Sequence, residues 1–228
     1  MKSRELIQSL EEGFKKKSNR KIAQSQKSYM RNQFDFYGLS AQKRREIQNP
    51  LFEQYFIESK DNLEELIKAL WKKKERDYQY CAQELILKYA LKWQSEHINL
   101  FEFMITHKSW WDTIDFIAPK IIARYFTLYP KKIDNQIDKW ILSNNIWLQR
   151  SCLIFQLKHK ENLNTKLLNH IIKGLLDTEE FFINKAIGWI LREYSKTNKA
   201  WVINFVKKTK LHNLTRREAL RFVKKKNK

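Results

Sequence analysis

Apolar side chains recur along this chain at a fixed interval of 35 residues. Positions 63, 98, 133, 168 and 203 hold Leu, Ile, Ile, Leu and Ile, and positions 70, 105, 140 and 175 hold Leu, Ile, Trp and Leu. The two columns lie seven residues apart, which is two helical turns, so they mark the buried stripe of one helix in each repeat. We therefore predict helices within residues 63–70, 98–105, 133–141, 167–176 and 203–206.

A second helix is predicted in each repeat, within residues 77–91, 109–126, 147–158 and 181–195. Its apolar column at positions 82, 117, 152 and 187 holds Ala, Ile, Cys and Ile. Helix pairs stacked at this period form an α-solenoid, whose neighbouring second helices line a concave surface. The tetratricopeptide pattern W-x-x-L-G-x-x-Y is absent, so HEAT-like repeats describe the period better. We expect one domain over residues 1–228, with a short basic tail at about 222–228.

The composition agrees with an all-α fold. The 228 residues include 4 Gly and 3 Pro, which leaves little material for hairpin turns. Cys81 and Cys152 lie inside apolar periodic segments without a CxxC or a His/Cys cluster, so neither a disulfide scaffold nor a metal site is predicted, and no cofactor is expected. The N-terminus lacks a signal-peptide core and no apolar run is long enough to cross a membrane, so we expect a cytoplasmic protein.

The charge of the chain favours a binding protein over a simple scaffold. The formal net charge is +20, from 45 Lys and Arg against 25 Asp and Glu, which is the electrostatic footprint of a protein whose partner is a polyanion. Nucleic acid is the leading candidate, and a merely solvated basic surface is the alternative. The basic ends "FKKKSNRK" and "TRREALRFVKKKNK" either follow phosphates or are solvated.

One column of the second helices is polar or amphipathic instead of apolar. It consists of Tyr80, Asp115, Arg150 and Lys185. Trp111 lies four residues before Asp115, and Trp189 lies four residues after Lys185, so both tryptophans project from the face of this column. Asp115 and Arg150 either form an ion pair between repeats or belong to a functional site. A carboxylate on a face that binds phosphate is locally inconsistent, and such residues often mark a site.

The stretch "SWWD" at residues 109–112 has its own structural interpretation. Ser109, followed three residues later by Asp112, resembles a capping box at the start of a helix. Trp110 is rotated by about 100° from Trp111 on a helix, so we expect Trp110 to pack in the interior.

Longer motifs give the sequence a resemblance to a known family. The stretches "SYMRNQFDFYGL", "SWWDTID", "WLQRSCLIFQL", "KAIGWILREYSKTN" and "LTRREALRF" occur in order and nearly from end to end of the chain. In these stretches the sequence resembles the DNA alkylation repair enzymes of the AlkD type, which are HEAT-like-repeat DNA glycosylases.

The resemblance implies an activity and a set of site residues. It implies that Trp111, Asp115, Arg150 and Trp189 form a catalytic cleft, lined by Tyr29 from the N-terminal side. The implied reaction is monofunctional hydrolysis of the N-glycosidic bond of cationic alkylated purines, such as 3-methyladenine and 7-methylguanine, in duplex DNA. The product is an abasic site for base excision repair.

Each residue has an expected role in this reaction. We expect Asp115 to stabilise the oxocarbenium-like state and position water, and the two tryptophans to pack on the sugar and lesion. Arg150 is expected to clamp a phosphate while keeping Asp115 ionised, and Lys185 to bind DNA in a similar way.

Two alternatives to the enzyme remain at this stage. A solenoid with the same basic face could bind nucleic acid without catalysis, or serve as a protein-binding scaffold. Duplex DNA is the expected partner, and we expect a monomer.

Overall fold

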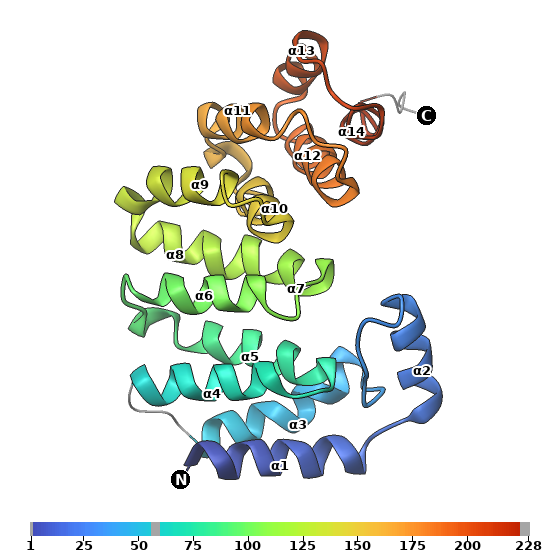
Figure 1. The fold of residues 1–228 in the computed structure, drawn as a ribbon, viewed down its shortest axis with the longest axis vertical. Coiled ribbons are helices and arrows are strands. Elements are labelled where there is room, and N and C mark those ends of the chain that lie inside the picture. Colours follow the sequence, from blue (N-terminus) through green and yellow to red (C-terminus); the bar gives the residue numbers. More distant parts are fainter. Residues whose placement is uncertain (1, 56–59, 224–228) are drawn as a thin grey trace. The chain divides into compact units, whose positions relative to one another are not determined.

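The computed structural model of the protein describes residues 2–55 and 60–223, and almost all of its regular structure is helical (Figure 1). Among these residues the β-structure consists of one isolated bridge, between Asp35 and Glu75. The predicted all-α fold, an α-solenoid of paired helices, is confirmed. Contacts within the chain divide it into two compact units, Met1–Gln94 and Ser95–Lys228. The single domain expected over residues 1–228 stays a prediction, and residues 224–228 of the predicted tail lie outside the described residues.

The N-terminal unit contains the helices α1 (Lys2–Lys16), α2 (Arg20–Tyr29), α3 (Ala41–Gln54), α4 (Lys60–Lys72) and α5 (Arg76–Lys88), followed by the 3-10 turn η1 (Ala90–Lys92). Helix α1 packs against α3 and α4, and α5 packs against α3 and α4. The predicted helices within residues 63–70 and 77–91 correspond to α4 and α5. Helix α5 ends at Lys88, before the end of the second prediction, and Tyr89 is the N-cap of the following turn η1.

Helix α2 has no buried residue and is held to this unit by hydrogen bonds. The side-chain amide of Gln26 donates to the carbonyl of Leu39 over 2.9 Å, and Nζ of Lys27 donates to Asp35 over 2.8 Å. The N–H of Asn19 donates to the carbonyl of Tyr37 over 2.8 Å. Gly38 follows with a φ of +80°, and a Cβ there would stand 2.1 Å from the carbonyl oxygen of Asn19. Only glycine allows the chain to pass so close to the start of α2. This contact fixes the helix that ends in Tyr29.

The C-terminal unit contains the helices α6 (His97–Thr106), α7 (Trp111–Phe116), α8 (Ala123–Leu128), α9 (Ile133–Ile141), α10 (Ile146–Ile154), α11 (Thr165–Gly174), α12 (Phe181–Tyr194), α13 (Lys199–Lys208) and α14 (Asn213–Ala219). The 3-10 turns η3 (Pro130–Lys132) and η4 (Lys160–Asn162) lie between them. Helix α10 packs against α7 on one side and α12 on the other, and α12 packs closely against α14. The second helices are therefore neighbours, as the repeat predicts.

The buried columns follow the predicted period with two exceptions, of which the first is Ile133, which is only half-buried. The columns that begin at Leu70 and Ala82 are buried in every repeat. In α13, by contrast, Ile203 is 41% exposed, while Val202, Phe205 and Val206 are buried. The prediction for Ile203 was wrong because the buried face of this last helix is shifted by one residue from the 35-residue interval, which turns Ile203 to the surface.

The segment predicted as one helix over residues 109–126 is interrupted in its middle. A π-helical turn, η2 (Ile117–Ile122), joins α7 to α8, and the N–H of Ala123 donates to the carbonyl of Ala118, five residues before it. Pro119 lies in this turn and has no N–H for the α-helical bond to the carbonyl of Asp115. The predicted helix is therefore divided into α7, which carries Trp111 and Asp115, and α8.

The capping box predicted at Ser109 is not formed. The Ser109 hydroxyl donates to the carbonyl of Ile105 over 2.6 Å, at the end of the preceding helix. Trp110 is the N-cap of α7, with extended backbone angles, and Asp112 occupies the second helical position. Sequence spacing placed the start of the helix one residue too early because the serine closes α6 instead of opening α7.

Candidate active site

Arg150 joins three helices of the C-terminal unit through one buried guanidinium group. Its side chain, on α10, is 4% exposed. The Nε donates to Oδ1 of Asp115 on α7 over 2.9 Å, and Nη2 donates to Oδ2 over 3.1 Å. The third nitrogen, Nη1, donates to the carbonyl of Phe182 on α12 over 2.6 Å. The guanidinium therefore fixes the orientation of the Asp115 carboxylate relative to both neighbouring helices.

The carboxylate of Asp115 lies at the border between the interior and the surface. Its side chain is 21% exposed, compared with 4% for its partner Arg150. Burial raises the pKa of Asp115 above its ordinary value of 3.8, the charge and hydrogen bonds of Arg150 act to lower it, and the charge of Asp112 adds to the increase. The carboxylate has lone pairs beyond the two that Arg150 occupies, so it can also accept from a ligand or from water.

A pocket of about 320 Å³ opens beside this ion pair. It is lined by Trp111, Asp115, Arg150, Phe181, Phe182, Lys185, Trp189 and Arg192. Four of these side chains are aromatic, and of the described residues that line the pocket Asp115 alone carries a carboxylate. A hollow with aromatic walls and one fixed anion is suited to a flat or cationic group.

The structure thus brings five of the sequence-predicted site residues to one pocket. Trp111 and Asp115 come from α7, Arg150 from α10, and Lys185 and Trp189 from α12. Tyr29 ends α2 in the N-terminal unit, where it is 70% exposed, and its role stays a prediction.

Three further lining residues were missed from the sequence. Phe181 lies four residues before Lys185 and Arg192 lies three residues after Trp189, so helical spacing places both on the face that was identified. Phe182 contributes the backbone oxygen that Arg150 binds, and its ring packs against Trp147 with centroids 4.9 Å apart. Helical spacing could have predicted Phe181 and Arg192. It could not have predicted Phe182, because a hydrogen bond to a backbone oxygen does not depend on the residue type.

Trp110 packs against the ring of a pocket residue, but it is only half-buried, whereas the sequence predicted an interior position. Its ring lies 5.4 Å from that of Phe182 and 5.8 Å from that of Trp147, measured between centroids. Among the described residues its buried indole N–H has no hydrogen-bond partner. Of the two adjacent tryptophans, Trp110 therefore packs against other rings, whereas Trp111 forms part of the pocket wall.

Glu218 on α14 holds the two other cations of the pocket. Its carboxylate accepts from Nζ of Lys185 over 2.8 Å and from Nη1 of Arg192 over 2.5 Å. The hydrogen bond from Lys185 lowers the pKa of Glu218 more than burial raises it, so the group stays ionised at neutral pH. The approach of α14 depends on Gly188, because a Cβ there would stand 2.5 Å from Cβ of Glu218.

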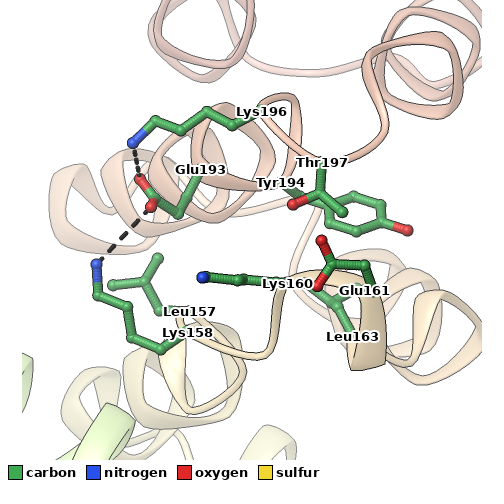
Figure 2. Close-up of a pocket in the computed structure, with 9 residues that line it drawn as sticks. All are labelled: Leu157, Lys158, Lys160, Glu161, Leu163, Glu193, Tyr194, Lys196 and Thr197. Carbon is green, nitrogen blue, oxygen red and sulfur yellow. Dashed lines mark hydrogen bonds and ion pairs between the residues drawn. The ribbon is translucent and has the colours of Figure 1, made fainter.

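A second hollow of this unit, of about 300 Å³, has a different charge pattern. Figure 2 shows Lys158 and Lys196 reaching Glu193 from opposite sides, with nitrogen–oxygen distances of 3.7 and 2.6 Å. Its lysines are thus partly neutralised by a local carboxylate, and none of the sequence-predicted site residues lines it. The aromatic pocket is therefore the better candidate for the active site.

Residues 2–55 and 60–223 contain neither a recognisable metal site nor a membrane-spanning helix. No group of three or more His, Cys, Asp or Glu side chains is arranged to hold a metal ion there. None of the helices in that part of the chain combines the length and the apolar character needed to cross a membrane. Cys81 and Cys152 are buried free thiols.

Comparison with known proteins identifies the family of the chain. The family model described as "DNA alkylation repair enzyme" matches residues 10–223. The chain belongs to this family. A solved structure titled "Predicted DNA alkylation repair enzyme from Enterococcus faecalis" is 34% identical, with a TM-score of 0.85 over 92% of this chain and 98% of the other. A comparison with curated protein sequences finds no match. Membership in this family implies a DNA-binding protein of DNA repair.

The dependence of Asp115 on Arg150 can be measured with a double-mutant cycle. We expect Arg150→Gln to lower the free energy of unfolding by about 3 to 5 kcal/mol, because it leaves a buried carboxylate without its counter-ion. Adding Asp115→Asn to Arg150→Gln should restore more than about 1 kcal/mol, because the unpaired charge is then gone. Urea denaturation of the four proteins at neutral pH gives both values. Strictly additive effects would show that the two residues are not coupled.

Proposed function

We propose that the protein is a monofunctional DNA glycosylase that releases N3- and N7-alkylated purines from duplex DNA and leaves abasic sites. The observation that supports this most is the Asp115 carboxylate, which Arg150 holds at the wall of an aromatic pocket in a chain of the DNA alkylation repair family. An alkylated purine of this kind already carries a positive charge and is a good leaving group. The protein therefore has no need to protonate the base.

The bond that breaks is the one between C1′ of the deoxyribose and the purine nitrogen. Its electron pair leaves with the purine, which becomes neutral, and the positive charge moves onto the sugar as an oxocarbenium-like ion. Water then attacks C1′ and loses a proton to Asp115 or to solvent. Asp115 stabilises the cation first and orients the water afterwards, which are both roles of an ionised carboxylate.

The magnitude of this effect is sufficient for catalysis. Two unit charges about 4 Å apart in an effective dielectric constant of about 20 attract each other by roughly 4 kcal/mol, which is on the order of a thousandfold in rate. The charge of Arg150 offsets part of this attraction. The faces of Trp111 and Trp189 add cation–π attraction of about 1 to 2 kcal/mol each when water is excluded.

The contacts of Arg150 favour a different role from the phosphate clamp expected from the sequence. Its guanidinium is nearly buried, and its three nitrogens donate to oxygens of the protein. We therefore assign Arg150 to positioning Asp115. Lys185, with a side chain 40% exposed, and Arg192 are better placed to attract DNA phosphates at the rim of the pocket.

Replacing the carboxylate tests the proposal directly. We expect Asp115→Asn to reduce the rate of methylpurine release from methylated duplex DNA by about a hundredfold to a thousandfold, because the amide lacks the negative charge. Its affinity for duplex DNA, measured by fluorescence anisotropy, should stay the same or rise slightly, because a charge that repels phosphate is removed. Chromatography of the freed bases gives the rate.

Asp112→Asn is the matched control, since it makes the same chemical change three residues away, on a side chain that does not line the pocket. It should keep release within about threefold of the unmodified protein, because a more distant, solvent-screened charge contributes little. Wild-type protein that binds methylated duplex but releases no base above the spontaneous rate would identify a non-catalytic DNA-binding solenoid.

The pH dependence of release follows from the raised pKa of Asp115. Only the ionised carboxylate stabilises the cation, so the rate should fall as the pH falls through that pKa. Because burial raises this pKa above 3.8, the acid limb should have its midpoint above that value. Single-turnover release at saturating protein, corrected for spontaneous depurination, measures the limb, and Asp115→Asn should lack it. A midpoint at or below 3.8 would contradict the assignment.

A further inference from the structure

A groove of about 380 Å³ lies between α11 and α13, near the top of Figure 1. Three lysines line it, Lys166 and Lys173 from α11 and Lys208 from α13. Asn169 of α11 and Asn204 of α13 also line the groove and contribute side-chain amides. Helix α11 rests on α9 and α10, whereas α13 rests on α12 and α14, so the groove runs between helices that are supported separately. We call it the α11–α13 groove.

The groove is strongly basic because neither helix carries an acidic residue. The sequences TKLLNHIIKG and KAWVINFVKK contain five lysines and no Asp or Glu. Among the described residues no carboxylate forms an ion pair with any of these five lysines, which are Lys166, Lys173, Lys199, Lys207 and Lys208. Like charges gathered in this way repel one another, and a polyanion relieves the repulsion.

Several other lysines of the same unit pair with carboxylates, although Lys131 and Lys132, like the groove lysines, form no ion pair among the described residues. Lys139 pairs with Glu102, Lys185 with Glu218, and both Lys158 and Lys196 with Glu193 (Figure 2). Three of the four lysines that line the two hollows described above thus share their charge with a carboxylate of the protein. The lysines of the α11–α13 groove form no such ion pair, so their whole charge is available to a partner.

The groove is separate from the aromatic pocket. The pocket is lined by second helices of the repeats, α7, α10 and α12, whereas the groove is lined by the first helices, and no residue lines both. In a solenoid of paired helices the first and second helices form different faces. A DNA segment at the pocket is therefore not the segment that this groove would contact.

The polar groups of the groove fit a phosphate backbone rather than bases. Ammonium and side-chain amide groups donate to phosphate oxygens without reading sequence. Lys166 and Lys173 lie seven residues apart, about 10.5 Å along the helix axis, which spans roughly three nucleotides at about 3.4 Å each.

The two aromatic residues that line the groove, Trp201 and Phe205, are already used for packing. The ring of Trp201 stacks on Phe205 at 5.0 Å and 13°, and it meets Tyr194 edge to face at 5.5 Å. Single-strand binding relies on aromatic faces that are open to stack with bases. Duplex DNA is therefore the better fit.

We propose that the α11–α13 groove is a second DNA-binding surface, which holds the phosphates of a duplex segment separate from the one at the aromatic pocket. The proposal rests on the proposed function only in taking DNA as the substrate, and base release is not part of it. With two such surfaces, one protein molecule bridges two duplex segments.

A bridging assay tests the proposal. A duplex is fixed to beads, the protein is added at low salt, and capture of a fluorescent undamaged duplex is measured. Wild-type protein should capture it. The variant Lys173→Gln/Lys208→Gln should lose most of the capture, whereas the control Lys131→Gln/Lys132→Gln, with the same change in net charge on exposed residues of η3, should not. The slope of log affinity for the second duplex against log salt should become less steep by about 1.8 in the groove variant, because two phosphate contacts are lost.

The outcomes separate this proposal from the proposed function. Methylpurine release by the groove variant at saturating DNA should equal that of the wild type, so a protein without release activity would leave the bridging result intact. Equal capture by the groove variant and the control would overturn the groove proposal. It would also be overturned if wild type captured only a fluorescent single strand, or if polyglutamate were bound at the groove and duplex were not.

Discussion

The buried guanidinium of Arg150 is the constraint on which the pocket depends. A buried charge costs several kcal/mol unless it is paired and hydrogen-bonded, so α7 and α12 must present Asp115 and the carbonyl of Phe182 to α10 in one geometry. On α14 the charges are exchanged: one carboxylate, that of Glu218, accepts hydrogen bonds from two cations, Lys185 and Arg192. The charges around the pocket are therefore oriented before a ligand arrives, which is the condition for electrostatic catalysis without reorganisation.

Much of this arrangement follows from periodicity that a single sequence contains. The 35-residue interval predicted the helix pairs because each repeat must bury the same stripe against its neighbours. The same interval, combined with helical spacing, grouped Asp115 with Arg150 and placed Trp111 beside them. These predictions needed only regular helices in a regular stack. They describe the molecule where the repeat is undisturbed, as in the packing of α4 against α5 and of α9 against α10.

Local departures from the repeat were not predictable in the same way. The π-helical turn at Pro119 divides the predicted helix into α7 and α8, and the last repeat shifts by one residue so that Ile203 is exposed. Glu218 had no sequence signal, since its role depends on α14 packing against α12 at Gly188. Whether Arg150 was buried or open to phosphate depended on how many protein oxygens surround it. Periodicity carries no information on such nonlocal contacts.

The central claim is that Asp115 stabilises positive charge on the sugar. The most direct measurement compares the affinities of the protein for two duplexes, one with a protonated pyrrolidine in place of a deoxyribose and one with neutral tetrahydrofuran. The account predicts that the wild type binds the cationic duplex at least about a hundredfold more tightly, as expected of a transition-state analogue. It also predicts that Asp115→Asn reduces this preference at least about tenfold, while the two tryptophans retain part of it. Equal affinities for the two duplexes, or a preference unchanged in Asp115→Asn, would contradict it.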